Sequence, residues 1–196
     1  MPDPQLIVFA GLPGTGKSSL ARAVAREAHA VYLDKDTIKD RVVALADQMK
    51  LDLGTQLAGP LSYELLVDLA RDNLTLGLNV VLDSPAAYQV FRDKVKVLAR
   101  SLKVNLRVIE CICTDERLLR QRIEGRGEEL SDHRTRDWDS LQQARGRFEQ
   151  LTDRRLIVDT AESLATNLRK IRGYLAGGAA GDGAASNPSH GQGAPL

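Results

Sequence analysis

The sequence lacks the features that would place the protein in a membrane, outside the cell or along a nucleic acid. Its apolar runs all fall short of the ~20 residues that cross a bilayer, and its first residues lack the basic and long apolar segments of a signal peptide. Two cysteines in 196 residues do not make a disulfide framework. The 27 basic and 26 acidic residues give no support to a whole-surface attraction to nucleic acid or membrane. We therefore expect a cytoplasmic protein with no membrane contact and no evident obligate protein partner.

Aromatic residues are also scarce, at 4% of the chain. This scarcity argues against a platform that stacks the bases of a single-stranded nucleic acid. Residues 176–196 contain six glycines, no aromatic residue and no large aliphatic residue before Leu196. Such a segment cannot bury enough apolar surface to offset the entropy lost on ordering. The composition therefore predicts one domain over residues 1–175 and a disordered tail over residues 176–196.

Short apolar runs alternate with longer helical patterns over the first 175 residues, which is typical of a parallel α/β sheet. The runs are near-continuous Val, Ile and Leu, as expected where helices cover both faces of the sheet. The predicted strands are Leu6–Ala10, Val31–Leu33, Asn79–Leu82, Leu106–Ile112 and Leu156–Val158. The predicted helices, which show i, i+3, i+4 apolar spacing, are Lys17–Ala28, Ser62–Leu76, Gln89–Leu102, Asp115–Glu124, Arg134–Leu151 and Glu162–Leu175. Two glycines and a proline predict an irregular insertion over Met49–Pro60.

A glycine-rich motif follows the first predicted strand and opens the first predicted helix. It fits the pattern G-x-x-x-x-G-K-S, whose glycines let successive backbone N–H groups surround phosphate oxygens. The N-terminus of the helix adds its positive dipole end. Lys17 would place a cation against the β- and γ-phosphates, and the Ser18 hydroxyl would enter a Mg²⁺ shell. A chance turn is the weaker interpretation, and the motif predicts a nucleotide site at Gly11, Pro13, Gly14, Thr15, Gly16, Lys17, Ser18 and Ser19.

An acidic residue, Asp83, ends the predicted strand over Asn79–Leu82. An aspartate at this place in a nucleotide-binding sheet usually holds the water shell of Mg²⁺. The alternative is structural, since the same side chain could cap the turn before Pro85. We predict Ser18 and Asp83 as the two residues that hold the metal.

A second acidic segment, Asp34-Lys-Asp36, follows the predicted strand at Val31. Its carboxylates project from the C-terminal end of a strand, where parallel α/β sheets place their ligands. Asp36 could therefore accept the proton of an acceptor hydroxyl as that hydroxyl attacks a γ-phosphoryl group. Lys39 and Arg41 follow at positions that could hold the acceptor. The alternative is that Asp34 or Asp36 caps the next helix.

A cluster of arginines follows the fourth predicted strand. Arg122 and Arg126 are four residues apart and share one helical face, if the helix continues that far. Arginines on a lid over a triphosphate would neutralise the charge that develops during transfer. The alternative is a solvated helix in which Glu116, Glu124, Glu128 and Glu129 pair with them. For Thr160, after the last strand, a helix cap is the better interpretation.

Two further features have structural rather than chemical interpretations. Cys111 and Cys113 lie on one face of an apolar strand, and without another pair of ligands they do not make a zinc site. We expect buried free thiols there. Trp138 has helical spacing with Leu141 and Arg145, and we expect it to pack in the core rather than to stack on a base.

These motifs together resemble the P-loop small-molecule and polynucleotide kinases, which include adenylylsulfate kinases, gluconate kinases, chloramphenicol phosphotransferases and polynucleotide 5′-hydroxyl kinases. The resemblance covers about Leu6 to Leu175. It implies a five-stranded parallel sheet of order 2-3-1-4-5 with a helical lid, and Mg²⁺- and ATP-dependent transfer to a hydroxyl. The Asp36-Thr-Ile-Lys39 segment is similar to the D-x-x-R of several members, with Lys in place of Arg. Because Lys offers a point charge rather than a fork, Arg41 is the alternative acceptor ligand.

The residues favour an ATP- and Mg²⁺-dependent phosphotransferase that acts on a hydroxyl of a small molecule. In this interpretation Lys17, Arg122 and Arg126 stabilise the phosphoryl oxygens, Arg122 also contacts the nucleotide, and Asp36 is the base. A polynucleotide 5′-hydroxyl kinase is the alternative enzyme, with the same catalytic residues and a nucleic-acid 5′ end as acceptor. A nucleotide-binding regulatory ATPase is the alternative from another class. The sequence leaves the acceptor open.

Overall fold

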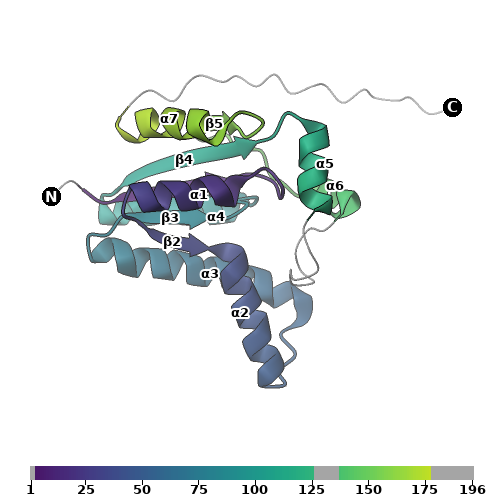
Figure 1. Cartoon of the computed structure of the whole chain (residues 1–196). Coiled ribbons are helices and arrows are strands. Elements are labelled where there is room, and N and C mark those ends of the chain that lie inside the picture. Colours follow the sequence, from purple (N-terminus) through teal and green to yellow (C-terminus); the bar gives the residue numbers. More distant parts are fainter. Residues whose placement is uncertain (1–2, 126–136, 178–196) are drawn as a thin grey trace.

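The computed structural model of the chain describes residues 3–125 and 137–177 (Figure 1). Arg126 and most of the expected tail, residues 178–196, lie outside the described residues. Five parallel strands form one sheet in the order β2-β3-β1-β4-β5, which confirms the predicted order. The strands are β1 (Gln5–Ala10), β2 (Val31–Asp34), β3 (Val80–Asp83), β4 (Asn105–Ile112) and β5 (Leu156–Asp159).

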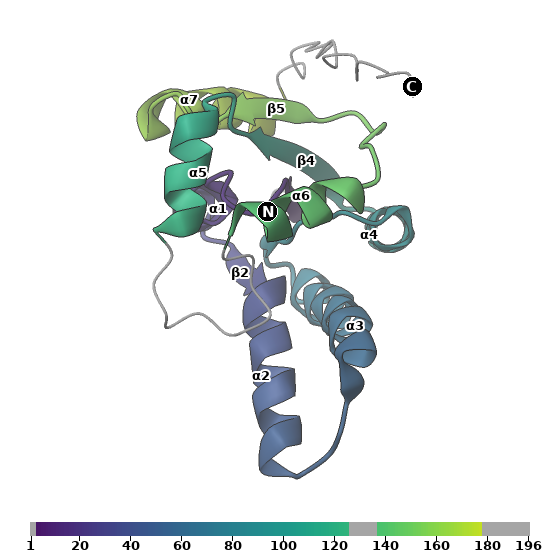
Figure 2. The same ribbon diagram turned by 90° about the vertical axis from the view of Figure 1, so that its right-hand side faces the viewer.

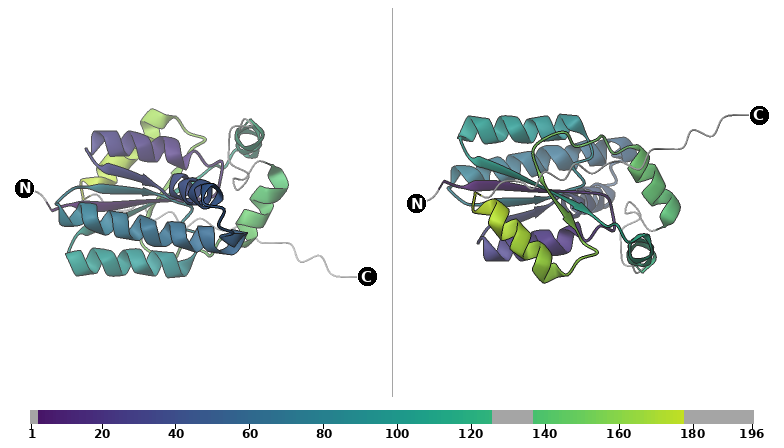
Figure 3. Two further views of the ribbon diagram at one scale, coloured as in Figure 1. Left: turned by 90° about the horizontal axis from the view of Figure 1, so that it is seen from below. Right: turned by 90° about the horizontal axis from the view of Figure 1, so that it is seen from above.

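Helices cover both faces of this sheet, as the two views of Figure 3 show. They are α1 (Lys17–Glu27), α2 (Lys35–Gln48), α3 (Gly54–Thr75), α4 (Gln89–Leu102), α5 (Glu116–Glu124), α6 (Trp138–Gly146) and α7 (Leu164–Leu175). Alternate residues of β1 serve the two faces. Leu6 and Val8 pack in a core with α3 and α4, whereas Ile7 and Phe9 pack in a second core with α1 and α7. Burial on both faces explains why this strand is apolar at every position from Leu6 to Ala10.

The segment between α1 and β3 differs from the prediction. The irregular insertion expected over Met49–Pro60 is confirmed only for residues 49–53, between α2 and α3, and is wrong from Gly54 onward, because α3 begins there and contains Pro60. Proline lacks the N–H that an interior helix position donates. Burial of Ala58 and Ser62 on either side of Pro60 anchors this part of α3, so packing outweighs the missing bond. The sequence also gave no bounds for α2, which forms with α3 a hairpin that projects from the sheet (Figure 2).

Two smaller elements lie at the C-terminal ends of the strands, beside the site described below (Figure 1). Leu119 and Ile123 of α5 pack with Leu141 of α6 in a small apolar cluster, and Trp138 lies partly buried against it. The predicted packing of Trp138 is therefore confirmed. The helix expected over 134–151 is shorter than predicted and ends at Gly146. None of the helices in the described ranges is long and apolar enough to cross a membrane.

Candidate active site

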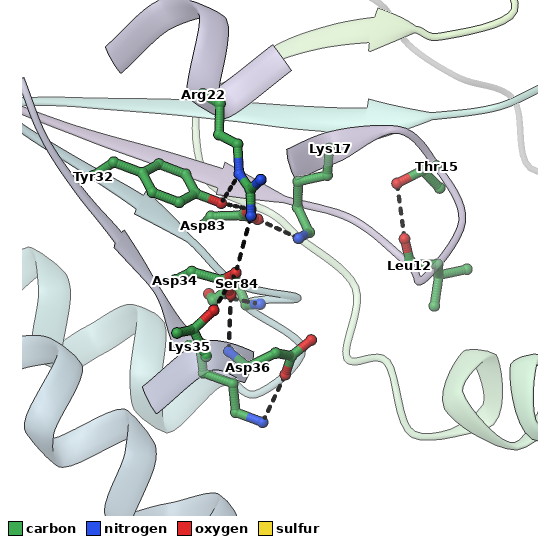
Figure 4. Close-up of polar contacts among 12 residues, drawn as sticks. Leu12, Thr15, Lys17, Arg22, Tyr32, Asp34, Lys35, Asp36, Asp83 and Ser84 are labelled. Atoms are coloured by element: carbon green, nitrogen blue, oxygen red, sulfur yellow. Dashed lines mark hydrogen bonds and ion pairs between the residues drawn. The ribbon is translucent and has the colours of Figure 1, made fainter. Parts of the chain in front are cut away.

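The glycine-rich loop between β1 and α1 has a backbone that its neighbours enforce. Gly11 has φ of 142°, and a Cβ there would lie 2.4 Å from the carbonyl oxygen of Cys111. Gly14 has φ of 85°, and a Cβ there would lie 2.7 Å from Cδ1 of Ile123 on α5. Thr15 Oγ1 donates to the carbonyl oxygen of Leu12 at 2.8 Å, which braces the loop from inside (Figure 4). Only glycine tolerates these two positions without strain.

The loop opens into a cavity of about 440 Å³ at the N-terminus of α1. Gly16 is the residue before this helix and has no side chain to accept from the N–H groups of the first turn. Those N–H groups and the dipole of the helix make its N-terminus a natural site for an anion. The predicted loop residues all line the cavity, and they are joined there by Asp36, Pro85, Arg122, Thr160, Glu162, Leu164 and Asn167.

Asp83 is buried at the end of β3, with 1% of its surface exposed. Its Oδ1 forms an ion pair with Lys17 Nζ, and its Oδ2 accepts a hydrogen bond of 2.6 Å from the Tyr32 hydroxyl (Figure 4). Burial and the negative charge of Asp83 raise the pKa of Tyr32. Capping of the following turn falls to Ser84, whose Oγ accepts from the N–H of Ala86 at 3.1 Å. Asp83 therefore lies beside the loop lysine, in a position that suits a ligand of a metal's water shell.

The cap of α2 is Asp34 and not Asp36. Asp34 Oδ1 accepts from the N–H of Asp36 at 2.9 Å, and its Oδ2 accepts from the Thr37 hydroxyl at 3.0 Å. Asp36 thus has its side chain in the cavity, where Lys35 Nζ lies 3.3 Å from its Oδ1 (Figure 4). This arrangement places one carboxylate in the lining of the cavity, with the amine of Lys35, which is not part of that lining, paired to it.

An aromatic cluster adjoins this pair of charged groups. Lys35 is 9% exposed, and its Nζ lies 5.2 Å from the ring centre of Tyr63. The Tyr63 ring in turn lies 4.6 Å from the ring of Phe91 and 6.2 Å from that of Tyr88. Burial chiefly, with the charge of Asp36 adding to it, raises the pKa of Tyr63. Lys35 is therefore a desolvated cation between an aromatic wall and a carboxylate.

The other two predicted acceptor ligands lie farther along α2. Lys39 is half-buried, and burial, with the nearby charge of Lys35, lowers its pKa. Arg41 is exposed. Neither side chain lines the cavity that contains the phosphate loop, so the structure does not bring them together with Asp36 in that cavity.

Arg122 extends from α5 to the end of β5. Its Nη1 donates to Thr160 Oγ1 at 2.8 Å, and its Nη2 donates to the Thr160 carbonyl oxygen at 3.0 Å. A Cβ on Gly16 would lie 3.3 Å from Nη1, so the guanidinium also borders the phosphate loop. The structure thus places Arg122 at the cavity rather than in the solvated ion pairs of the alternative interpretation.

Thr160 is not a helix cap, contrary to the sequence interpretation. Ser163 caps α7, since its Oγ accepts from the N–H of Thr166 at 3.1 Å. The Thr160 hydroxyl donates to the carbonyl oxygen of Ile112 at 3.1 Å while it accepts from Arg122. It joins the ends of β4 and β5 to α5. Thr160 is free to bond to the Ile112 carbonyl and the Arg122 guanidinium because Ser163, three residues later, supplies the cap of α7.

The expectation of buried free thiols is confirmed for Cys111 and is wrong for Cys113. Both are free thiols, but Cys113 is only partly buried because it follows the end of β4 at Ile112. Burial raises the pKa of Cys111 to about 12. Within residues 3–125 and 137–177, no group of three or more His, Cys, Asp or Glu side chains could hold a metal ion. A Mg²⁺ ion would therefore depend on phosphate oxygens and water as well as on Ser18 and Asp83.

Sequence reasoning missed three residues of this site. Tyr32 and Lys35 each pair with a residue that was predicted, but those pairings depend on side-chain positions that no local pattern gives. Asn167 did carry a signal. It is a polar residue on the apolar stripe of α7 that includes Leu168 and Ile171, and it is 1% exposed.

Solved structures support the fold. The chain is similar to a gluconokinase from Sinorhizobium meliloti 1021, with 22% identity, a TM-score of 0.62, and coverage of 90% of this chain and 94% of the other. It is similar to the Mycobacterium tuberculosis APS kinase CysC in complex with AMPPNP and APS, with 18% identity, a TM-score of 0.64, and coverage of 90% and 99%. It is also similar to Chaetomium thermophilum Kti12 in complex with ADP-AlF3, with 16% identity, a TM-score of 0.64, and coverage of 87% and 97%.

Sequence comparison assigns the family. No curated protein is similar enough to this chain to count as a match. A family model described as an AAA domain, AAA_33, does match, and it spans residues 6–151, which include the phosphate loop, Asp36, Asp83 and Arg122. The chain therefore belongs to the AAA_33 family of P-loop kinase domains.

Proposed function

We propose that the protein is a Mg²⁺- and ATP-dependent phosphotransferase that moves the γ-phosphoryl group of ATP to a hydroxyl of a small-molecule acceptor. One observation carries the proposal: the phosphate loop, Asp36 and Arg122 line a single cavity of about 440 Å³. A loop alone would suit any nucleotide-binding protein. A carboxylate and a guanidinium in the same cavity supply the base and the charge stabilisation that transfer to a hydroxyl requires.

The residues around the loop fit a nucleotide triphosphate. Gly11, Gly14 and Gly16 have no side chains that would fill the loop. Ser18, in the first turn of α1, is exposed. Lys17 is paired with Asp83. When phosphate oxygens enter the loop, Lys17 is expected to turn from Asp83 toward them. That movement would free one carboxylate oxygen of Asp83 for the water shell of Mg²⁺, which supplies neutralisation of phosphate charge when bound.

In the transfer step, Asp36 accepts the proton of the acceptor hydroxyl. The oxygen of that hydroxyl forms a bond to the γ-phosphorus as the bond from this phosphorus to the bridging oxygen of ADP breaks. Lys17 and Arg122 stabilise the negative charge on the phosphoryl and bridging oxygens. Arg126, four residues after Arg122, would act with it.

The acceptor is proposed to lie on the side of the cavity formed by α2. Asp36 there has Lys35 beside it and the Tyr63 ring beyond, a mixed polar and aromatic surface. Lys39 follows one helical turn after Lys35 and would approach an acceptor that extends along α2. Arg41 is exposed and would contact only a larger acceptor.

The proposal is tested by ATP consumption against a panel of acceptors. The panel holds sugars, nucleosides, aminoglycoside and phenicol antibiotics and a 5′-hydroxyl oligonucleotide, with Lys17→Ala as the inactive control. Stimulation by a small molecule that is lost in the control is expected. Stimulation by the oligonucleotide alone would replace the proposal with a polynucleotide kinase. Slow hydrolysis that no acceptor changes would favour a regulatory ATPase.

A further inference from the structure

Asn167 lines the cavity and carries a buried hydrogen-bond acceptor that has no partner among the described residues. It is the fourth residue of α7, is 1% exposed and lines the cavity of the phosphate loop. Its Nδ2 donates to the carbonyl oxygen of Asp159 at 2.8 Å and to that of Glu162 at 3.5 Å. Its Oδ1 is buried and has no hydrogen-bond partner. A buried acceptor without a partner is costly, and native structures retain few of them.

The orientation of this amide is fixed by its neighbours. If the amide were flipped, Oδ1 would face the two carbonyl oxygens that Nδ2 now serves, and no hydrogen bond would join them. Asn167 can therefore offer only an acceptor to a ligand. The polar groups near it are engaged: the Thr160 hydroxyl donates to Ile112, and the Glu162 carboxylate accepts from Lys170 at 2.7 and 2.8 Å.

Asn167 lines the same cavity as the phosphate loop. Thr160 lies beside the loop, since a Cβ on Gly16 would lie 3.4 Å from Thr160 Oγ1, and Arg122 borders both residues. A nucleotide with its phosphates on the loop would extend past Thr160 and Arg122, so its base would lie along the part of the lining that Glu162, Leu164 and Asn167 form.

We propose that Asn167 Oδ1 accepts a hydrogen bond from the 6-amino group of adenine and so makes the site select ATP over GTP. Adenine presents an amino donor at position 6, where guanine presents an oxygen acceptor. The 6-amino group of ATP donates the hydrogen bond that Oδ1 lacks, whereas GTP would place its O6, a second acceptor, opposite Oδ1 with no hydrogen between them. The inference rests on the nucleotide site of the proposed function but not on phosphoryl transfer, since it concerns binding alone.

Equilibrium binding of nucleotides to the full chain tests this assignment. Displacement of a fluorescent ATP analogue is measured with ATP, GTP and purine riboside triphosphate, which carries hydrogen in place of the 6-amino group. We expect ATP to bind about tenfold tighter than purine riboside triphosphate, because the analogue leaves the buried acceptor unpaired. GTP is expected to bind at least as weakly as that analogue. Equal binding of ATP and the analogue by the unaltered protein would overturn the assignment, whatever any variant does.

The Asn167→Leu variant locates the effect. In this variant the preference for ATP over the analogue is expected to disappear, while Arg169→Ala, an exposed change on the same helix, should retain it. Binding of inorganic tripolyphosphate, which needs only the phosphate loop, should be unchanged in both. A tenfold preference that survives Asn167→Leu would assign the recognition to another residue and overturn the proposal. Absence of both ATP and tripolyphosphate binding in the unaltered protein would instead overturn the nucleotide site itself.

Discussion

Substitution of Arg122 distinguishes its two possible roles, a structural link between α5 and the end of β5 and a cation that stabilises phosphate charge. Its guanidinium makes two hydrogen bonds to Thr160, at 2.8 and 3.0 Å, and borders the loop at Gly16. At about 1 kcal/mol of net stabilisation for each bond, Arg122→Ala should lower the free energy of unfolding by about 1–2 kcal/mol. A lysine retains the charge and can replace one of the two bonds, so Arg122→Lys should cost about 1 kcal/mol or less.

The effect on turnover should be much larger than the effect on stability. Removal of one donor that stabilises transition-state charge typically lowers kcat about 10²- to 10³-fold, and we expect a fall of that size for Arg122→Ala. Arg122→Lys should show a smaller but clear fall, because lysine keeps the charge and loses the two-pronged geometry. The assay compares urea unfolding with acceptor-stimulated ATP consumption. The matched control is Arg120→Lys, on an exposed face of α5 where the side chain lies 4.0 Å from Glu124 and 4.7 Å from the Trp138 ring centre. This control should retain full turnover.

An Arg122→Lys protein that turns over as fast as the unaltered one would contradict the role of Arg122 in phosphoryl transfer. Arg122 would then serve only to join α5 to the end of β5, and the loss of stability in Arg122→Ala would be its whole effect. A fall in turnover equal in Arg122→Lys and Arg120→Lys would also contradict it, because only Arg122 borders the loop.

Three further substitutions test the packing around the site. Gly11→Ala should lower the free energy of unfolding, measured in urea, by about 2 kcal/mol or more, because Gly11 has φ of 142° and the new Cβ would lie 2.4 Å from the carbonyl oxygen of Cys111. Gly59→Ala, the control, has open space around the new Cβ and should not destabilise the protein. Tyr32→Phe should cost about 1–3 kcal/mol, since it leaves an oxygen of the buried aspartate of β3 unpaired, and unchanged urea unfolding would contradict that. Burial raises the pKa of Cys111 to about 12, so iodoacetamide at pH 8 should modify Cys113 of the native protein first, as mass spectrometry of digests would show; equal labelling would argue against the burial.

Patterns within short segments of the sequence were enough to predict the phosphate loop and the parallel sheet. Strand order followed from the resemblance that the motifs carry, and the phosphate loop was predictable because its glycines and Lys17 obey a fixed spacing. Asp36 was predictable as a carboxylate at the end of β2, although the choice between Asp34 and Asp36 as the cap of α2 required the structure. The sequence therefore predicted which types of residue form the site and that they lie at the C-terminal ends of the strands.

The remainder depends on contacts between distant parts of the chain. Pro60 and two nearby glycines predict a loop, and burial of the surrounding turns makes a helix instead. Thr160 has a hydroxyl that could cap a helix, but Arg122, 38 residues away in the sequence, donates a hydrogen bond to that hydroxyl instead. The pairing of Tyr32 with Asp83 across adjacent strands follows from the register of β2 on β3, which no single segment contains.

The fate of the γ-phosphate is the most direct test of the account. With γ-³²P-labelled ATP, Mg²⁺ and the acceptor panel, the account predicts that label moves from ATP to a phosphomonoester of one small molecule. It also predicts that Asp36→Asn, which removes the base, retains ATP binding and loses this transfer. Label that appears only as inorganic phosphate with every acceptor, or transfer that is undiminished in Asp36→Asn, would contradict the assignment of this cavity to phosphoryl transfer with Asp36 as its base.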